Sequence, residues 1–566
     1  MKHRGLWLTW IAAFLLSSCG LGFDTTVLKD ATVTLYGPNN ETTLRSLGTF
    51  DVKYVEDEPF IYYCDLETYG SMMQQTFADN VTCKFTRYSG TTYWQVYRGN
   101  EYIFVATISP YDNCIYYGGS LFNAYDEGAS ISYESSLMYA CQTESSMIKE
   151  GTSMVTFDYS KMSQTDHTRN NKIYLPLAYW DMTLGQTAER YHMVTSQGLV
   201  QYTEMTDLYG YAFPNGVKAL DSYGTFGAMP DYYKTFERDL FLCFLENRYG
   251  FAKDYNLSSM KYFYSTYYPN YYNYLTSADP DERFAGYSAC LSAFGDMHTR
   301  MLVNAGMWGE SGETYVSSEI ELNYRNVQRE LKQQREAHFS EHGLDINAIE
   351  YSQDGKTALF RFDSFSGCMS PKDEHGNIRD DIYLEDTFYY IVHQLKEIRN
   401  HSRNVTNVVM DISLNGGGYV IIMQKILALL GDMTSSTYSY SDRRDYLYES
   451  KVTVNPEEVD LNFTPNMYFD FYMLTSPCSF SCGNALPCFA RHQGLVKTIG
   501  ENSGGGECTV ETVCTPGGHY FCFSTDNRMV DYDNGQYYHV EQGCGVDYPL
   551  GYQSYYDIES IAALLA

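Results

Sequence analysis

The chain has 566 residues, 56 of them tyrosine, and its formal net charge is −31 at pH 7. This length exceeds one ordinary hydrophobic core and predicts roughly two to four domains. So acidic a protein repels nucleic acid and anionic lipid head groups, which argues against a nucleic-acid-binding function.

The amino-terminal residues indicate export. Basic residues precede an apolar run from Leu6 to Leu16, which is too short to span a bilayer but typical of a signal peptide. The run leads into Ser18, Cys19 and Gly20, a pattern that resembles the bacterial lipobox. The resemblance implies a lipid on Cys19 that anchors the exported chain to the cell envelope, at the outer membrane, in the periplasm or on the cell surface. An ordinary cleavage site followed by an unmodified cysteine is the alternative.

The number of cysteines is compatible with disulfide bonds in an exported protein. The chain has 15 cysteines, so an even number remains if one of them carries the lipid. Disulfide bonds are expected in an oxidising compartment, and proximity along the chain favours Cys64 with Cys83 and Cys114 with Cys141. Buried free thiols are the alternative. No cysteine spacing matches a zinc site, and we expect neither a metal nor an organic cofactor.

The sequence pattern divides the chain into four parts. Residues 1–18 form the signal peptide, and residues 19–221 read as a β-rich accessory region of short strands and turns. Apolar residues at helical spacing mark residues 222–345 as a helical segment. Residues 346–566 alternate strands with helices, which predicts an α/β core with crossover connections.

The predicted elements of the second half follow from apolar periodicity and capping residues. A helix carries Phe236, Leu240 and Phe244, with Thr235 as its expected cap, and a second helix runs from Pro280 to Gly295. Strands are predicted over 358–362, 407–411, 467–474 and 495–500, and helices over 387–399, 420–430, 483–492 and 558–565.

Two turns between a predicted strand and the next predicted helix are rich in small residues. Gly416, Gly417 and Gly418 follow the first strand, where glycine lets the backbone approach a reacting atom and build an oxyanion hole. A tight turn without function is the alternative. Ser481 lies in the second turn, where a serine presents its hydroxyl at the start of a helix. A simple helix cap is the alternative for this serine.

Residues 411–418, 475–484 and 499–506 together resemble the C-terminal processing, or tail-specific, peptidase family. The resemblance extends from about residue 235 to the carboxyl terminus and implies a crotonase/ClpP-like α/β peptidase core. It makes Ser481 the nucleophile of a serine endopeptidase, with oxyanion donors from the backbone of Gly416 or Gly417 and of Cys482. Polypeptides are the implied substrate.

The identity of the base separates two branches of this family. One branch uses a lysine, and here Gly506 occupies the aligned position, so that dyad is absent. The tricorn-like branch uses a histidine in an upstream Gly-Asp-x-His-Ser/Thr motif. Residues 295–299 read Gly-Asp-Met-His-Thr and make His298 the implied general base.

The same resemblance implies an acid that orients the histidine. Glu541 lies at the matching position near the carboxyl terminus, with Glu501 and Asp296 as competing acids and Thr299 as an assisting hydroxyl. Cys482 raises the alternative of a thiol nucleophile, although it is one place beyond the motif serine. His492 stands where lysine-dependent relatives have an aspartate, and no role is assigned to it.

The sequence therefore predicts an exported, lipid-anchored serine endopeptidase acting through an acyl-enzyme. The main alternative is a catalytically inactive relative that binds peptides or cell-wall fragments through the same cleft. A carbohydrate-binding accessory region is a further alternative. No PDZ module is recognised in the sequence, and the oligomeric state is left open.

Overall fold

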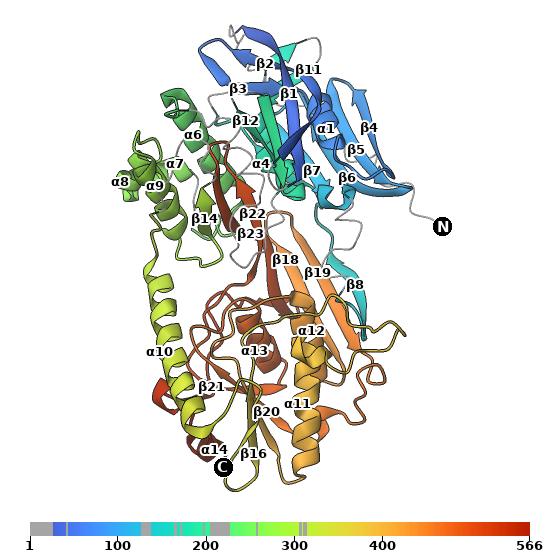
Figure 1. Cartoon of the computed structure of the whole chain (residues 1–566), viewed down its shortest axis with the longest axis vertical. Helices are drawn as coiled ribbons and strands as arrows, with labels where there is room; N and C mark the ends of the chain where they lie inside the picture. Colours follow the sequence, from blue (N-terminus) through green and yellow to red (C-terminus); the bar gives the residue numbers. More distant parts are fainter. Residues whose placement is uncertain are drawn as a thin grey trace.

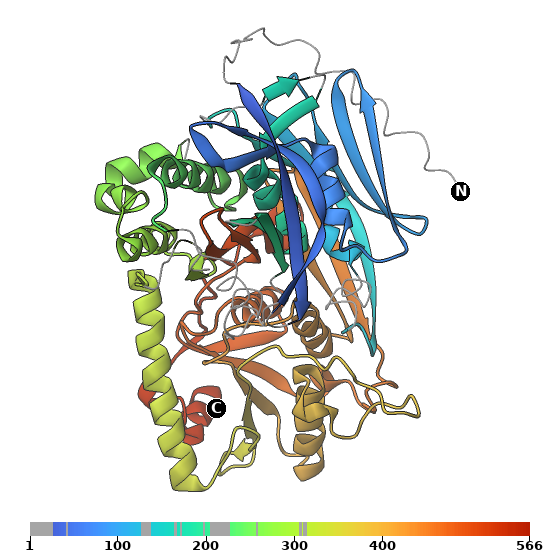
Figure 2. The ribbon, with the colours of Figure 1, turned by 45° about the horizontal axis from the view of Figure 1, so that its top comes forward.

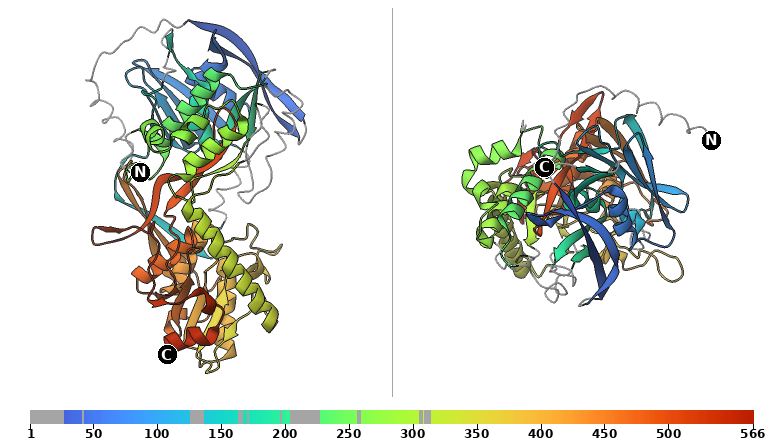
Figure 3. Two further views of the ribbon diagram at one scale, coloured as in Figure 1. Left: turned by 90° about the vertical axis from the view of Figure 1, so that its left-hand side faces the viewer. Right: turned by 90° about the horizontal axis from the view of Figure 1, so that it is seen from above.

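The computed structural model describes residues 27–40, 43–125, 137–162, 167–169, 172–195, 198–203, 227–255, 259–304, 308 and 314–566. The predicted signal peptide and Cys19 lie outside these residues. The molecule is elongated, with the β-rich amino-terminal region at one end and the α/β core at the other (Figure 1). Helix α10 (Glu319–His342) runs along one side of the molecule and leads from the helical segment down to the core (Figure 3).

A six-stranded sheet forms the centre of the α/β core. Its order is β15-β16-β17-β20-β21-β25, and all neighbours are parallel except the edge pair β15 and β16. Parallel strands covered on both faces are apolar throughout, which explains the continuous burial of the three central strands. The strands are β15 (Glu350–Tyr351), β16 (Thr357–Arg361), β17 (Asn407–Asp411), β20 (Asp470–Thr475), β21 (Val496–Gly500) and β25 (Tyr548–Pro549).

Helices cover both faces of this sheet. Side chains that alternate along β16 and β17 sort onto the two faces, Phe360 and Met410 onto one and Leu359 and Val409 onto the other. The first face packs against α11 (Thr387–His401), α12 (Val420–Leu430) and α13 (Cys482–His492). The second packs against α10 and α14 (Ile558–Leu565). The result is a three-layer α/β sandwich.

A second, antiparallel sheet joins the core to the rest of the molecule. Its order is β14-β23-β18-β19-β8, and β22 and β24 also pair with β23. Strand β8 comes from the predicted accessory region, β14 from the helical segment, and the others from the carboxyl-terminal part. The strands are β8 (Cys141–Lys149), β14 (Arg300–Asn304), β18 (Thr434–Ser441), β19 (Tyr446–Val454), β22 (Cys508–Cys514), β23 (His519–Asp533) and β24 (Gln536–Tyr538).

The amino-terminal region contains two further sheets, ordered β10-β11-β3-β2-β1-β13-β12 and β4-β5-β6-β7-β9. Short helices α1 (Leu66–Gln74) and α4 (Leu177–Thr183) pack against them. The strands are β1 (Leu28–Asn40), β2 (Thr43–Val55), β3 (Glu58–Cys64), β4 (Val81–Tyr88), β5 (Thr91–Arg98), β6 (Glu101–Ile108), β7 (Cys114–Gly119), β9 (Val155–Asp158), β10 (His167–Arg169), β11 (Lys172–Pro176), β12 (Arg190–Thr195) and β13 (Gly198–Thr203).

The helical segment lies on one side of these sheets (Figure 2). It comprises α6 (Asp231–Arg248), α7 (Met260–Tyr267), α8 (Pro269–Tyr274) and α9 (Pro280–Ser292). Helix α6 begins at Asp231 after Pro230, so the expected cap at Thr235 is wrong. Helix α9 begins at the predicted Pro280, and the carboxylate of Asp279 caps it by accepting two backbone N–H groups. The segment shares one apolar core with the amino-terminal sheets and with β22 and β23.

The structure confirms the predicted fold class, an α/β core with a helical segment and a β-rich amino-terminal region. The predicted boundaries of these parts stay predictions. The 14 described cysteines are free thiols, so neither predicted pair, Cys64 with Cys83 or Cys114 with Cys141, is formed. Within the described residues, no helix combines the length and apolarity that crossing a bilayer requires.

Candidate active site

Ser481 lies at the turn from β20 into α13, with an unusual backbone conformation. Its φ is 57° and its ψ is −124°, a region that costs a residue with a side chain about 1–3 kcal/mol. The residue occupies the cap position of α13, but its side chain makes no capping hydrogen bond. Capping therefore does not explain this serine.

Hydrogen bonds hold the serine turn against the end of β17. The hydroxyl groups of Ser476 and Ser479 donate to the carbonyls of Ser413 and Ile412, at 2.5 and 2.7 Å. Both serines are fully buried. The amide of Ser481 itself donates to the carbonyl of Gly505 at 2.9 Å. The reactive position is thus fixed by rigid elements on two sides.

The glycine cluster touches Ser481 directly. A Cβ atom on Gly417, whose φ is 108°, would lie 2.7 Å from Cβ and 3.1 Å from Oγ of Ser481, so only glycine fits. The amide of Gly417 already donates to Oδ1 of Asn415 at 2.9 Å. The amide of Gly416 has no such partner among the described residues, which makes it the better of the two predicted oxyanion donors.

Cys482, the first residue of α13, contributes its backbone at the start of the helix. Its side chain is buried, and its thiol donates to the carbonyl of Gly418 at 3.2 Å. The thiol thus braces the glycine cluster. This geometry does not favour the alternative in which Cys482 is the nucleophile.

His298 lies in the turn between α9 and β14. The carboxylate of Asp296 accepts the backbone N–H of His298 at 2.9 Å and the hydroxyl of Thr299 at 2.6 Å. Thr299 in turn accepts the amide of Ser524 from β23 at 3.0 Å. The predicted assisting residue, Thr299, therefore acts on the turn and not on the ring. Asp296 likewise holds the backbone of the motif.

The ring of His298 packs 4.6 Å from the ring of Phe480, the neighbour of Ser481. Its Nδ1 atom is buried and has no hydrogen-bond partner among the described residues. Burial lowers the pKa of His298 to about 4; Asp296 opposes this shift and Arg300 adds to it. The imidazole is therefore neutral at pH 7 and able to accept a proton.

Gly506 occupies the place where the lysine branch has its base. Its φ is 91°, and a Cβ atom there would lie 2.7 Å from Cε2 of Phe480 and 3.1 Å from Cε1 of His298. Phe480 and His298 fill the space that a longer side chain would need. The side chains of Phe480 and His298 thus occupy the space in which a lysine at position 506 would lie.

Glu541 lies behind the same glycine turn. Its Oε2 atom accepts the amides of Gly506 and Glu507 at 3.2 and 2.9 Å, and no described hydrogen bond joins it to His298. Burial, followed by the charge of Asp296, raises the pKa of Glu541 to about 8. Glu501, the other competing acid, is exposed and accepts the hydroxyl of Tyr552 at 2.6 Å.

Two side chains near the site escaped prediction or assignment. Glu507 is buried and accepts His539 Nδ1 at 3.0 Å and the amide of Val540 at 2.8 Å. Burial opposes its ionisation, but these hydrogen bonds outweigh burial and lower its pKa. The position of Glu507 directly after Gly506, which the family motif already marked, is the sequence signal that could have identified it. His492 pairs with Asp531 at 2.7 Å and thereby ties α13 to β23.

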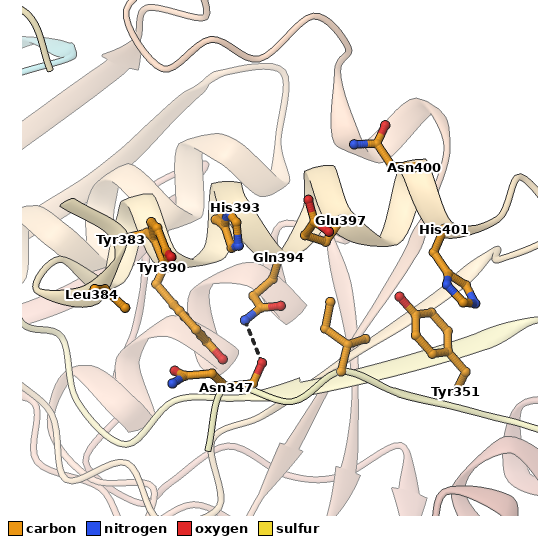
Figure 4. A pocket seen from close by; sticks show the side chains of 11 residues that line it. Asn347, Tyr351, Tyr383, Leu384, Tyr390, His393, Gln394, Glu397, Asn400 and His401 are labelled. Atoms are coloured by element: carbon orange, nitrogen blue, oxygen red, sulfur yellow. Dashed lines mark hydrogen bonds between the residues drawn. The ribbon is translucent and has the colours of Figure 1, made fainter. Parts of the chain in front are cut away.

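A cavity of about 660 Å³ lies elsewhere, between α11 and the segment that leads into β15 (Figure 4). Gln394 donates across it to the carbonyl of Asn347 at 3.0 Å, and His401 stacks on Tyr351 at 4.0 Å. None of the predicted catalytic or oxyanion residues lines this cavity. The cavity is therefore separate from the candidate active site.

Residues 359–547 match the family model described as peptidase family S41. This part of the chain is therefore a peptidase family S41 domain. It is a serine peptidase, a hydrolase of peptide bonds, and polypeptides are its substrates. The matched segment contains Ser481, the glycine cluster and Glu541, whereas His298 lies before it. No curated protein sequence matches the chain.

Solved structures give weaker likenesses. A Parabacteroides merdae protein assigned as a peptidase is 17% identical, with a TM-score of 0.38, and the match covers 52% of this chain and 87% of that chain. A lipoprotein from Streptococcus agalactiae is 15% identical, with a TM-score of 0.34, and the match covers 63% of this chain and 99% of that chain. The tricorn protease is 11% identical, with a TM-score of 0.33, and the match covers 95% of this chain and 58% of that chain. All three TM-scores lie below 0.5, so the family assignment rests on the family model alone.

Proposed function

We propose that the protein is an endopeptidase that cleaves polypeptides outside the cytoplasm through an acyl-enzyme on Ser481. The observation that supports this most is the position of Ser481: a strained serine without a capping bond, in contact with Gly417 and next to Phe480, on which His298 packs. Strained backbone held by a rigid scaffold is typical of a nucleophile at a strand-to-helix turn.

His298 acts as the general base in this mechanism. Because its pKa is about 4, the ring is neutral and takes the proton of the Ser481 hydroxyl as the serine attacks the scissile carbonyl. The same ring then gives the proton to the leaving amine. A water molecule attacks the acyl-enzyme in the second half of the reaction, again with His298 as the base.

The negative charge of the tetrahedral intermediate falls on the carbonyl oxygen. Backbone N–H groups of Gly416 and Cys482, at the two small-residue turns, stabilise this oxyanion. The start of α13 adds the positive end of its helix dipole. Gly417 contributes by leaving room for the serine, since its own amide is bonded to Asn415.

Glu541 is a positioning residue in this scheme. It binds the amides of Gly506 and Glu507, and Gly506 forms the wall behind the ring of His298. The orienting role expected for Glu541 is thus exerted through the glycine turn. Asp296 also positions this residue, by accepting the backbone N–H of His298.

The site of action is part of the proposal. The basic and apolar amino-terminal pattern and the lipobox-like Cys19 favour export and a lipid anchor at the cell envelope. When cells are grown with a radioactive fatty acid, the intact protein should carry the label and the Cys19→Ala variant should not. Equal labelling of the variant would contradict the anchor.

A serine-directed fluorophosphonate and a casein substrate test the mechanism. Ser481→Ala should abolish labelling and lower kcat by roughly 10³-fold or more, and His298→Ala should lower both to a similar degree. Ser318→Ala, which removes the cap of α10, and His492→Ala, which breaks the pair with Asp531, are matched controls that keep activity.

Retention of labelling and cleavage by Ser481→Ala would contradict the proposal. Absence of labelling in the folded wild-type protein, together with tight binding of intact peptides, would instead favour the peptide-binding alternative. Circular dichroism of each variant separates loss of chemistry from loss of fold.

A further inference from the structure

One face of α13 lies against the segment 540–547 and is bonded to it at both ends. The face consists of Asn484, Cys488 and Arg491, which lie on one side of the helix by their spacing of four and three residues. Nδ2 of Asn484 donates to the carbonyl of Val540 at 2.9 Å. Arg491 pairs with Asp547 at 2.8 Å.

Between these two bonds lie Cys488 and Cys544. Each shifts the pKa of the other's thiol: the pKa of Cys488 is raised and that of Cys544 is lowered. Cys544 is buried and Cys488 is partly exposed. The two cysteines thus lie at the centre of the contact between the helix that starts at Ser481 and the turn that follows Glu541.

A small polar network fixes the backbone around both cysteines. The hydroxyl of Ser503 donates to Oδ1 of Asn484 at 2.6 Å and accepts the amide of Cys544 at 2.7 Å. The thiol of Cys488 donates to the same Oδ1 at 3.4 Å. Because both residues are attached to one buried pair, Ser503 and Asn484, their approach is built into the fold and does not depend on mobile side chains.

We propose that Cys488 and Cys544 form a disulfide bond that fastens α13 to the turn carrying Glu541. The bond spans the two elements that hold the nucleophile and the positioning acid of the candidate site. It closes a long loop between residues 488 and 544, and such a bond stabilises the folded state chiefly by restricting the unfolded chain.

The oxidant is a small-molecule disulfide. The thiolate of Cys544, whose pKa is lowered by the neighbouring Cys488 and by Arg491, attacks one sulfur of that disulfide, breaks its S–S bond and releases one thiol. The thiol of Cys488 then loses its proton and attacks the mixed disulfide at the sulfur of Cys544. The second small thiol leaves with a proton, and two small thiols are formed for each protein bond.

The test uses the purified full chain, reduced and then treated with glutathione disulfide. Digestion without reduction, followed by mass spectrometry, should give a linked peptide containing Cys488 and Cys544. The oxidised protein should have a Tm about 5 °C above that of the reduced protein. Both the linked peptide and the Tm difference should disappear in Cys488→Ser and in Cys544→Ser.

Cys243→Ser is the matched control, because Cys243 is also buried, lies on α6 and donates its thiol to the carbonyl of Asp158. It should keep the linked peptide and the Tm difference. Two unlinked cysteines after oxidation of the wild-type protein would overturn the inference, and this result needs no variant to fold. Neither readout depends on catalysis, so failure here and failure of the proposed mechanism are distinguishable.

Discussion

At position 506, where lysine-dependent relatives have their base, the backbone of a glycine runs at a φ of 91° against two rings. The ring of His298 packs against Phe480, and the glycine turn at Gly506 lies close to both rings. No described side chain bonds to its Nδ1 atom. The position of the base thus depends on van der Waals contact, and a single added methyl group is enough to disturb it.

Gly506→Ala should therefore lower kcat by about 10- to 100-fold, because its Cβ would meet Phe480 at 2.7 Å and His298 at 3.1 Å. Gly535→Ala is the matched control: its φ is 86°, and no atom lies within 4 Å of the added Cβ. Both variants should lose about 1 kcal/mol of stability through the positive φ, but only Gly506→Ala should lose activity. Equal kcat values would show that Gly506 does not position the base.

The protonation of Glu541 gives a stability prediction with a defined sign. Its pKa is about 8 in the folded protein against an ordinary value of 4.5, so between these pH values folding requires uptake of a proton. This cost grows from pH 4.5 to pH 8. Glu541→Gln is neutral in both states and can still accept the amides of Gly506 and Glu507. The variant should match the wild-type Tm below pH 4.5 and exceed it by about a few degrees at pH 8.

Glu501→Gln, which replaces an exposed carboxylate outside the glycine turn, is the control variant for this comparison. A Tm difference for Glu541→Gln that is the same at pH 4 and pH 8 would mean that Glu541 is not held protonated by the fold.

At the scale of elements, the sequence predicted the bounds of a helix or strand well where burial alone set its apolar pattern. Strand β17 and helices α12 and α14 have the predicted bounds, because continuous apolar runs and clear periodicity define buried elements. Helix α10 lies within the predicted helical segment but was not identified as a separate element, since only Val327 and Leu331 of its residues are buried and its apolar pattern is correspondingly sparse. Strand β23 was missed because it buries polar residues such as Asp526 and Arg528, which pair with distant arginine and acidic partners.

The candidate site also has features that could be predicted from the sequence and features that could not. Ser481, His298 and the glycine cluster carry local motifs, so their residue types and order could be identified from the sequence. The replacement of the lysine by Phe480 and His298, and the attachment of Glu541 to the turn at Gly506, depend on distances between three separate segments. No pattern within one segment encodes such contacts.

At the scale of the whole molecule, one strand connects the amino-terminal region with the candidate site. The rings of Phe521 and Phe523 in β23 pack edge-on against Phe244 of α6, within the core shared with the amino-terminal sheets. The next residue of the strand, Ser524, donates its amide to Thr299 in the histidine motif. The antiparallel sheet also takes strands from the accessory region, the helical segment and the α/β core. We therefore expect these parts to unfold together.

Phe244→Ala tests this coupling far from the chemistry. Phe244 is fully buried, and its truncation should cost about 3–5 kcal/mol, whereas Tyr88→Ala, at a residue 74% exposed, should cost little. In both variants and in the wild type, near-ultraviolet circular dichroism and peptidase activity should be lost in one transition. Phe244→Ala should move both midpoints down by the same amount. If activity survived above the temperature at which α6 and its neighbours melt, the amino-terminal region and the α/β core would be independent folding units, because the contacts through β23 would then not be required to hold His298 in place.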